Sequence, residues 1–243
     1  MDRRTGSPRS PIPAAASERR DGRSSSLVAE RARVAALLER EGEAYASGAR
    51  AVAGVDEAGR GALAGPVFAA AVVLPPGEIL AGLDDSKALS PEVREALAPR
   101  IRARAASWAL GSASPSEIDA LGIAAATFLA MTRALAGLAQ RPDLVLVDGF
   151  RIPAWTGEQE AVVRGDARIA CIAAASVLAK TARDAALRAL DAEVPWYGLA
   201  AHKGYGSAAH LEALRRHGPS SHHRLTFAGV LSPGRVASPV AAA

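Results

Sequence analysis

Residues 51–74 read AVAGVDEAGRGALAGPVFAAAVVL, two runs of small and β-branched residues that are separated by a glycine-rich segment. Runs of this composition bounded by glycines are typical of β-strands. The pattern predicts strands over residues 51–55 and 65–74 that pair as a hairpin. Two carboxylates, Asp56 and Glu57, directly follow the first strand, so the segment that begins the sheet also carries charge where that strand ends.

The rest of the chain alternates between helical and strand patterns. A helix is expected after Ser90, a good N-cap, with Pro91 in its first turn. Together, the patterns predict helices over residues 91–104, 116–139 (with a break near Gly122), 169–190 and 207–217, and strands over residues 105–111 and 144–147. Strands that are followed by alternating helices and strands predict an α/β fold with a mixed central sheet flanked by helices.

By composition the chain divides into four parts. We predict a disordered Arg/Ser/Pro-rich tail (1–26), an amphipathic helix (27–48), the main α/β domain (49–195) and a C-terminal helical segment continuous with it (196–243). No run approaches the roughly 20 apolar residues that span a bilayer, and the tail lacks the apolar core of a secretory signal. One cysteine, Cys171, cannot form an internal disulfide. We therefore expect a cytoplasmic protein that does not bind a membrane.

Charge is distributed unevenly along the chain. Residues 1–26 carry a net charge of +3 and residues 196–243 carry +4, so the centre holds −3 of the total of +4. An acidic centre between basic ends suits an enzyme that binds cations and acts on a polyanion. A charge asymmetry of this size is also common in proteins without such a function. Of the 29 basic residues only three are lysines, Lys87, Lys180 and Lys203.

Four carboxylates follow predicted strands or lie in turns. Asp56 and Glu57 follow the first strand, Asp148 follows the apolar run 144–147, and Asp166 follows Gly165. Taken singly, the first pair could be solvated turn residues and Asp166 a helix N-cap. Adjacent residues of a regular strand point to opposite faces. Asp56 and Glu57 would therefore share one site only if the strand ends or bulges at Glu57.

Taken together, the four acids predict a metal site. They offer hard oxygen ligands and have neither cysteine nor histidine near them in sequence, as expected for Mg²⁺ or Mn²⁺. Two such ions about 4 Å apart can bind the attacking and leaving oxygens of a phosphodiester displacement.

Six segments resemble ribonuclease HII, the type 2 ribonuclease H family. They are AGVDEAGRGALAGPVFAAAVVL (53–74), DDSKALS (84–90), SEIDALGIAAATFLAMTRA (116–134), LVDG (146–149), RGDARIACIAAASVLAKTARD (164–184) and HKGYGSAAHLEALRRHGPSSHHRLTF (202–227). The segments occur in the family's order and at compatible spacing from about residue 50 to residue 227. Such a match is far more specific than any single motif.

The resemblance implies an RNase H-like fold and an endonuclease with two divalent ions, Mg²⁺ or Mn²⁺. The implied catalytic and metal-binding residues are Asp56, Glu57, Asp148 and Asp166. The implied substrates are RNA–DNA hybrids, whose RNA strand is hydrolysed, and DNA with embedded ribonucleotides, which is nicked on their 5′ side. Products would carry 3′-hydroxyl and 5′-phosphate ends, and the roles would be ribonucleotide excision repair and RNA primer removal.

The resemblance also implies substrate contacts. The backbone of Gly59, Arg60 and Gly61 would contact 2′-hydroxyl groups, which distinguish RNA from DNA. Tyr205 would pack on the deoxynucleotide after the ribonucleotide, and Lys87 would contact a phosphate. The simpler alternatives are a hairpin turn, a half-buried tyrosine and a solvated loop lysine.

Two further sets of polar residues receive simpler interpretations. Lys180 and Asp184, four residues apart in a predicted helix, are expected to form an intrahelical ion pair. The five histidines, all between His202 and His223, are expected at the surface, in contact with phosphates, rather than in a metal site.

The sequence departs from three rival identities. Ribonuclease HIII carries a separate folded N-terminal domain, for which residues 1–46 are too short and too polar. Type 1 ribonuclease H lacks the Asp-Glu/Gly-Arg-Gly opening. A catalytically silent nucleic-acid-binding protein would be expected to lose one of the four acids, and all four are present. The expected oligomeric state is a monomer.

Overall fold

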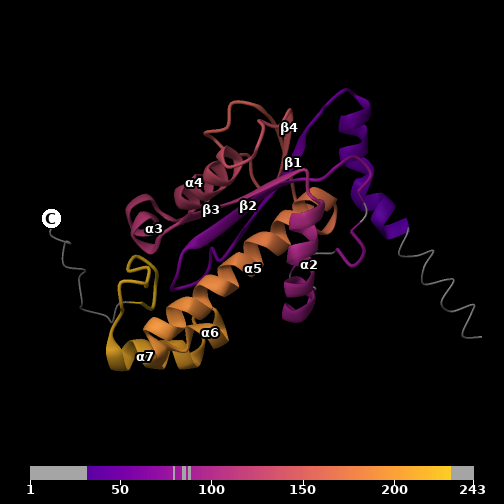
Figure 1. Cartoon of the computed structure of the whole chain (residues 1–243). Helices are drawn as coiled ribbons and strands as arrows, with labels where there is room; N and C mark the ends of the chain where they lie inside the picture. The colour runs from indigo at the N-terminus through magenta and orange to yellow at the C-terminus, as the bar shows by residue number, and fades with distance from the viewer. Residues whose placement is uncertain (1–31, 79, 84–85, 87–88, 231–243) are drawn as a thin grey trace, which may run out of the picture.

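The computed structural model describes residues 32–78, 80–83, 86 and 89–230 (Figure 1). The predicted tail over residues 1–26 and the candidate phosphate contact Lys87 lie outside these residues. Within the described part, residues 32–46 form a helix, which occupies most of the predicted N-terminal helix. No helix of the described part is long and apolar enough to cross a bilayer.

A five-stranded mixed sheet with the order β3-β2-β1-β4-β5 forms the centre of the molecule. The strands are β1 (Val52–Ala58), β2 (Val67–Val73), β3 (Ser107–Ala113), β4 (Leu144–Asp148) and β5 (Glu158–Val162). The predicted hairpin is confirmed, because β1 and β2 pair antiparallel, and β3 continues the antiparallel order. β4 runs parallel to both β1 and β5. The α/β class with a mixed central sheet is therefore confirmed.

Two long helices cover the two faces of the sheet (Figure 1). The helices of the described part that carry labels are α2 (Pro91–Arg104), α3 (Pro115–Leu121), α4 (Ile123–Ala136), α5 (Ala170–Glu193), α6 (Leu199–His202) and α7 (Ala208–His217). Alternate residues of β1 pack on opposite helices: Val52 joins the core with α5, whereas Ala53 and Val55 join the core with α4. The direction of a β1 side chain therefore decides which helix it meets.

α5 packs directly on the backbone of β1. A Cβ atom added to Gly54 would lie 2.2 Å from the carbonyl carbon of Cys171, so only glycine allows this approach. The first half of α5 is rich in alanine and almost wholly buried. Small side chains on both elements thus bring α5 close to the strand that carries Asp56.

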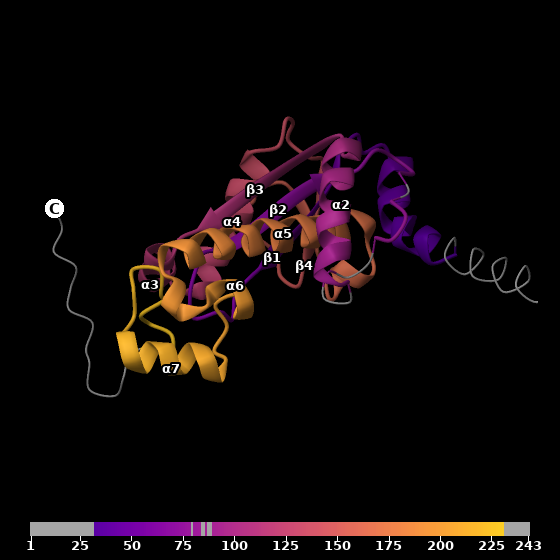
Figure 2. The same ribbon diagram turned by 60° about the horizontal axis from the view of Figure 1, so that its bottom comes forward.

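The C-terminal segment packs against the loop after β1, at the far end of α5 from the helix over residues 32–46 (Figure 2). An antiparallel bridge joins Ala64 to His223. The fully buried Arg224 donates hydrogen bonds to the carbonyl oxygens of Gly65 and Arg60. Residues near the C-terminus therefore shape the segment that follows the first strand.

Two expectations about the strands were wrong. β1 does not end at Val55 but continues through Ala58, so Asp56 and Glu57 lie within it. β5 was not expected, because its sequence lacks an apolar pattern. In the structure only Gln159 and Val162 of its five residues are buried. Asp166 follows β5 in a short 3₁₀ helix, Gly165–Ala167.

Candidate active site

Three of the four predicted acids lie together. Carboxylate oxygens of Asp56, Asp148 and Asp166 are all within 4.8 Å of one another. The topology explains this: β1, β4 and β5 are parallel, so their carboxyl ends share one edge of the sheet. Val55 pairs with Val147, so Asp56 and Asp148 come next in register and project from the same face.

The group is buried and tied to the backbone. Asp56 and Asp166 are each 3% exposed. An Asp148 carboxylate oxygen accepts a hydrogen bond from the Gly165 N–H at 2.7 Å, which fixes the segment of Asp166 to the end of β4. Asp56 accepts a hydrogen bond from the Glu57 N–H at 2.7 Å. Asp166 does not cap α5, whose N-cap residue is Ile169.

Burial raises the pKa of Asp56 well above its usual value, and the nearby charges of Glu57 and Asp148 raise it further. A buried carboxylate next to other carboxylates is costly unless a cation neutralises the group. Divalent cations with oxygen ligands meet this requirement, and the donor set is purely carboxylate. The residues present therefore fit Mg²⁺ or Mn²⁺.

Glu57 is not part of this three-acid group. β1 remains regular here, with Glu57 opposite Ala69, so its side chain faces α4 and the bulge that would bring it beside Asp56 is absent. It forms an ion pair with Arg60, with 3.3 Å between Oε1 and Nη1. Burial raises its pKa and Arg60 opposes the rise. A small cavity is lined by both Glu57 and Asp148, so Glu57 borders the group from the other face.

The predicted glycine loop and Tyr205 lie side by side. Gly59 has a φ of +94°, and a Cβ atom there would lie 1.9 Å from Nε of Arg183. A Cβ atom on Gly61 would be 3.9 Å from the ring of Tyr205. Tyr205 is 42% exposed, and the Arg183 guanidinium stacks 5.3 Å from its ring centre. A loop beside the acids thus presents backbone next to an accessible aromatic ring.

Arg183 supports this arrangement, although the sequence analysis did not single it out. It is fully buried, touches both Gly59 and Tyr205, and donates a hydrogen bond to the Lys203 carbonyl at 2.8 Å. Burial lowers its pKa. In a chain this rich in arginine, no local signal distinguishes it from solvated arginines, because its partners lie on other segments, with Gly59 more than 100 positions away.

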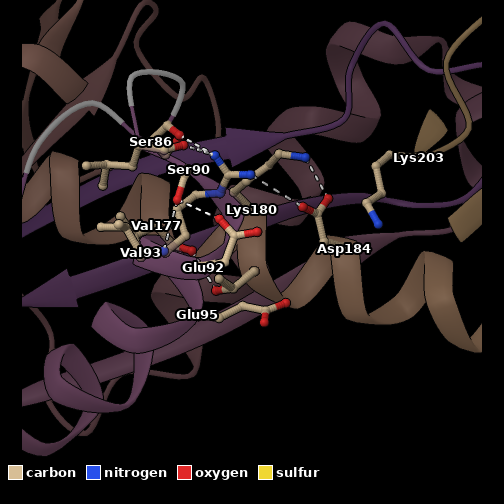
Figure 3. A network of polar contacts seen from close by, with 12 residues as sticks. Ser86, Ser90, Glu92, Val93, Glu95, Val177, Lys180, Asp184 and Lys203 are labelled. Atoms are coloured by element: carbon tan, nitrogen blue, oxygen red, sulfur yellow. Dashed lines mark hydrogen bonds and ion pairs between the residues drawn. The ribbon is translucent and has the colours of Figure 1, made fainter. Parts of the chain in front are cut away.

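A polar network connects Ser86 to Lys180 and Asp184 of α5 (Figure 3). Arg94 donates to the carbonyl oxygens of Ser86 and Leu89 at 2.7 and 2.6 Å. The Ser86 hydroxyl lies 2.7 Å from that of Ser176, a residue that opposes the rise in the pKa of Asp56.

The same network contains the predicted ion pair of α5. Nζ of Lys180 lies 2.6 Å from Oδ1 of Asp184, which confirms the predicted pair (Figure 3). Arg94 lies 3.8 Å from the other oxygen of Asp184. Arg94 therefore connects Ser86 and Leu89 to α5.

The interpretation of the histidines as surface residues is wrong for two of them. His210 is fully buried and His223 is 2% exposed. Their ring nitrogens contact each other, and His210 also contacts the Tyr205 carbonyl oxygen. Sequence spacing could not reveal this, because the two histidines lie on different segments that meet only in the fold.

Comparisons with known proteins agree with the resemblance. The family model described as Ribonuclease HII matches residues 53–230. Ribonuclease HII of Thiobacillus denitrificans is 57% identical over 177 residues, which cover 73% of this chain and 87% of that protein. Ribonuclease HII of Chromobacterium violaceum is 58% identical over 180 residues, which cover 74% of this chain and 91% of that protein.

A solved structure is similar in fold. The crystal structure of ribonuclease H2 from Pyrococcus horikoshii superposes with a TM-score of 0.63 and 26% identity, covering 74% of this chain and 95% of that one. Residues 53–230, which the family model matches, contain the three-acid group, the glycine loop and Tyr205. The chain belongs to the ribonuclease HII family and is a type 2 ribonuclease H.

Proposed function

We propose that this protein is an endonuclease that hydrolyses the RNA strand of RNA–DNA hybrids and nicks DNA on the 5′ side of an embedded ribonucleotide. The products carry 3′-hydroxyl and 5′-phosphate ends. Family membership supports cleavage of RNA in hybrids. The observation that carries the finer proposal is the buried three-acid group beside a glycine loop and an accessible tyrosine.

Asp56, Asp148 and Asp166 would hold two divalent ions, with Glu57 completing the ligand set from the other face of β1. When bound, such ions supply Lewis-acid activation of water and stabilisation of the leaving 3′ oxygen. The carboxylates would hold these cations where the substrate phosphate binds. The hydrogen bond from the Glu57 N–H keeps Asp56 oriented.

Substrate selection falls to the loop and to Tyr205. The backbone of Gly59, Arg60 and Gly61 can approach a sugar closely, and a 2′-hydroxyl offers both a donor and an acceptor to it. The ring of Tyr205 packs on the deoxynucleotide after the ribonucleotide, since an exposed aromatic face suits contact with a nucleotide. Lys87 contacts a phosphate near the cut. This arrangement favours an RNA-to-DNA junction.

In the cell this activity would begin ribonucleotide excision repair and remove RNA primers. The proposal includes a monomeric enzyme in the cytoplasm. It excludes a silent binding protein, since all four acids are retained.

A cleavage assay tests the proposal. The substrate is a labelled DNA duplex with one ribonucleotide, incubated with Mg²⁺ or Mn²⁺, and the controls are an all-DNA duplex, a long RNA–DNA hybrid and excess chelator. We expect a single nick 5′ of the ribonucleotide, cutting of the hybrid and no cutting of all-DNA. Cutting of the long hybrid alone would contradict ribonucleotide-directed nicking, and no cutting with either metal would support a silent binding protein.

A further inference from the structure

We propose that His210 and His223 form a hydrogen-bonded relay that positions Tyr205, and that the relay thereby sets the preference for a single embedded ribonucleotide over a long hybrid. The inference rests on the proposed function, because it assigns a task to the residue that contacts the junction. Both histidines are positioning residues that act through the backbone of Tyr205.

The relay is a continuous chain of contacts through the protein interior. His223 Nδ1 lies 3.0 Å from the Ser220 backbone nitrogen and 2.9 Å from the Ser220 hydroxyl. His223 Nε2 lies 3.0 Å from His210 Nε2. His210 Nδ1 lies 2.9 Å from the Tyr205 carbonyl oxygen. Four polar contacts therefore connect the segment after α7 to the segment before it.

The donors and acceptors at the two ends determine which nitrogen of each ring carries the proton. The Ser220 N–H can only donate, so Nδ1 of His223 accepts and the neutral ring carries its hydrogen on Nε2. That N–H donates to Nε2 of His210, which must accept. The hydrogen of His210 is then on Nδ1 and donates to the Tyr205 carbonyl, which can only accept. One pair of tautomers satisfies every contact.

The surroundings keep both rings neutral. Burial lowers the pKa of His210, and burial together with the neighbouring His210 lowers the pKa of His223 to about 4. The ring of His202 stacks on His210 at 4.4 Å, and the ring of Tyr197 lies 4.6 Å from His223. A proton added to His210 would place two N–H groups opposite each other across 3.0 Å. The relay is therefore held in its neutral form at neutral pH.

Tyr205 is the residue on which the relay ends. Its carbonyl accepts hydrogen bonds from His210 and from the N–H of Ser207, the N-cap of α7. The preceding Gly204 carbonyl accepts from the N–H of Leu63 at 2.8 Å, close to the glycine loop. With its backbone held on both sides, Tyr205 presents its half-exposed ring next to Gly61. Loss of the relay should let this ring move and weaken contact with the junction.

Nitrogen-15 NMR of histidine-labelled protein tests the relay directly in the wild type. The protein has five histidines, so the ring signals can be assigned with single substitutions. At pH 7.5 we expect neutral His223 with hydrogen on Nε2 and neutral His210 with hydrogen on Nδ1. The opposite tautomer at either ring, or a charged ring, would overturn the proposal.

Cleavage by variants tests its consequence. His210→Leu removes the contacts to both His223 and Tyr205, and it should lower the rate at a single ribonucleotide roughly tenfold more than the rate on a long hybrid, as expected when the Tyr205 carbonyl loses a buried hydrogen bond. His210→Asn should recover most of the loss, because the asparagine amide can still donate near the Nδ1 position. His217→Leu is the matched control, since His217 is exposed on the same helix, and it should leave both rates unchanged. Equal losses on both substrates with His210→Leu would contradict the proposal.

A double substitution separates the relay from the proposed function. If His210 acts through Tyr205, His210→Leu causes no further selective loss in a Tyr205→Ala background. A further selective loss there would contradict the relay. If Tyr205→Ala alone lowers both rates equally, junction contact by Tyr205 fails, and the NMR tautomers show separately whether the relay exists.

Discussion

At the scale of single residues, Asp56 holds a carboxyl group where its charge is disfavoured. The group is almost completely buried, close to the charges of Glu57 and Asp148, and its pKa is raised for these reasons. A protein that keeps such a group loses stability unless a bound ion compensates. This conflict between stability and charge is expected where carboxylates serve as metal ligands.

Asp56→Asn should separate catalysis from binding. The amide lacks the negative charge that a divalent ion requires. The cleavage rate should therefore fall by more than about 100-fold, beyond the loss typical of residues that only support metal ligands. Binding of a hybrid, measured by fluorescence anisotropy in chelator, should persist. Turnover near the wild-type rate would contradict the assignment of Asp56 as a metal ligand.

Tyr205→Ala should alter substrate preference rather than abolish activity. The ring is accessible beside Gly61, and a base or sugar stacked on it is worth about 1–3 kcal/mol. We therefore expect cleavage at a single ribonucleotide to fall roughly 10- to 100-fold, with a smaller loss on a long hybrid. Parallel rate measurements on the two substrates check this, and Tyr205→Phe should retain the wild-type preference because it keeps the ring. Equal losses would argue against junction contact.

At the scale of elements, the helix over residues 32–46 is joined to the start of α5. The buried Glu41 accepts a hydrogen bond from the Cys171 N–H at 2.7 Å, in the first turn of α5, whose N-cap residue provides no side-chain cap. Arg40 also forms an ion pair with Glu160 of β5, with 2.8 Å between Nη2 and Oε2. This helix precedes the residues that the family model matches, yet it holds the two elements on either side of Asp166.

Glu41 should make stability depend on pH. Burial raises its pKa from 4.5 to about 7, so between these values the folded protein binds a proton that the unfolded chain has released. Its contribution to the free energy of unfolding is thus intact below the lower value and declines as pH rises to about 7.

Glu41→Gln removes this titration and keeps an oxygen to accept from Cys171. Between pH 5 and pH 8 the free energy of unfolding of the wild type should therefore fall by roughly 1–3 kcal/mol relative to that of Glu41→Gln. Urea unfolding at both pH values measures this. Glu43→Gln, on the same helix but exposed, should show no such change in the difference from wild type. A pH-independent difference for Glu41→Gln would mean that Glu41 titrates alike in both states.

At the scale of the whole molecule, the parallel part of the sheet gathers acids from distant positions, and the C-terminal segment closes over the loop after β1. The three acids span residues 56 to 166, and the contact of Arg224 with Gly65 joins residues 159 positions apart. The site is thus complete only when the sheet and the C-terminal segment have both folded. Ions bound at the acids should stabilise the native fold as a whole.

Divalent ions should raise the melting temperature. An ion present at about 100 times its dissociation constant adds roughly 2.7 kcal/mol to the free energy of unfolding. For a chain of this size, this corresponds to a rise in melting temperature of roughly 5–10 °C. Differential scanning fluorimetry with Mg²⁺, Mn²⁺ or chelator measures the shift. Asp148→Asn should reduce it, whereas Glu95→Gln, on the exposed face of α2, should not. An equal shift in the Asp148→Asn protein would place the stabilising ions elsewhere.

The sequence by itself determined the features that depend on short-range patterns. Alternating strand and helix patterns predicted the mixed α/β sheet, and the acids were identified because carboxylates at strand ends and turns are costly without a partner. The spacing of Lys180 and Asp184 predicted their ion pair, because residues four apart in a helix are neighbours. These features follow from the periodicity of one element at a time.

Tertiary structure alone decided the features that depend on contacts between distant residues. β5 forms because β4 offers it a parallel edge, not because its own sequence is apolar. Pairing with β2 extends β1 past Val55, and that pairing directs Glu57 to the opposite face of the strand from Asp56. The burial of His210 against His223 requires two segments to meet across the fold. Local sequence does not encode such contacts, because their energy arises only when both partners have been brought together.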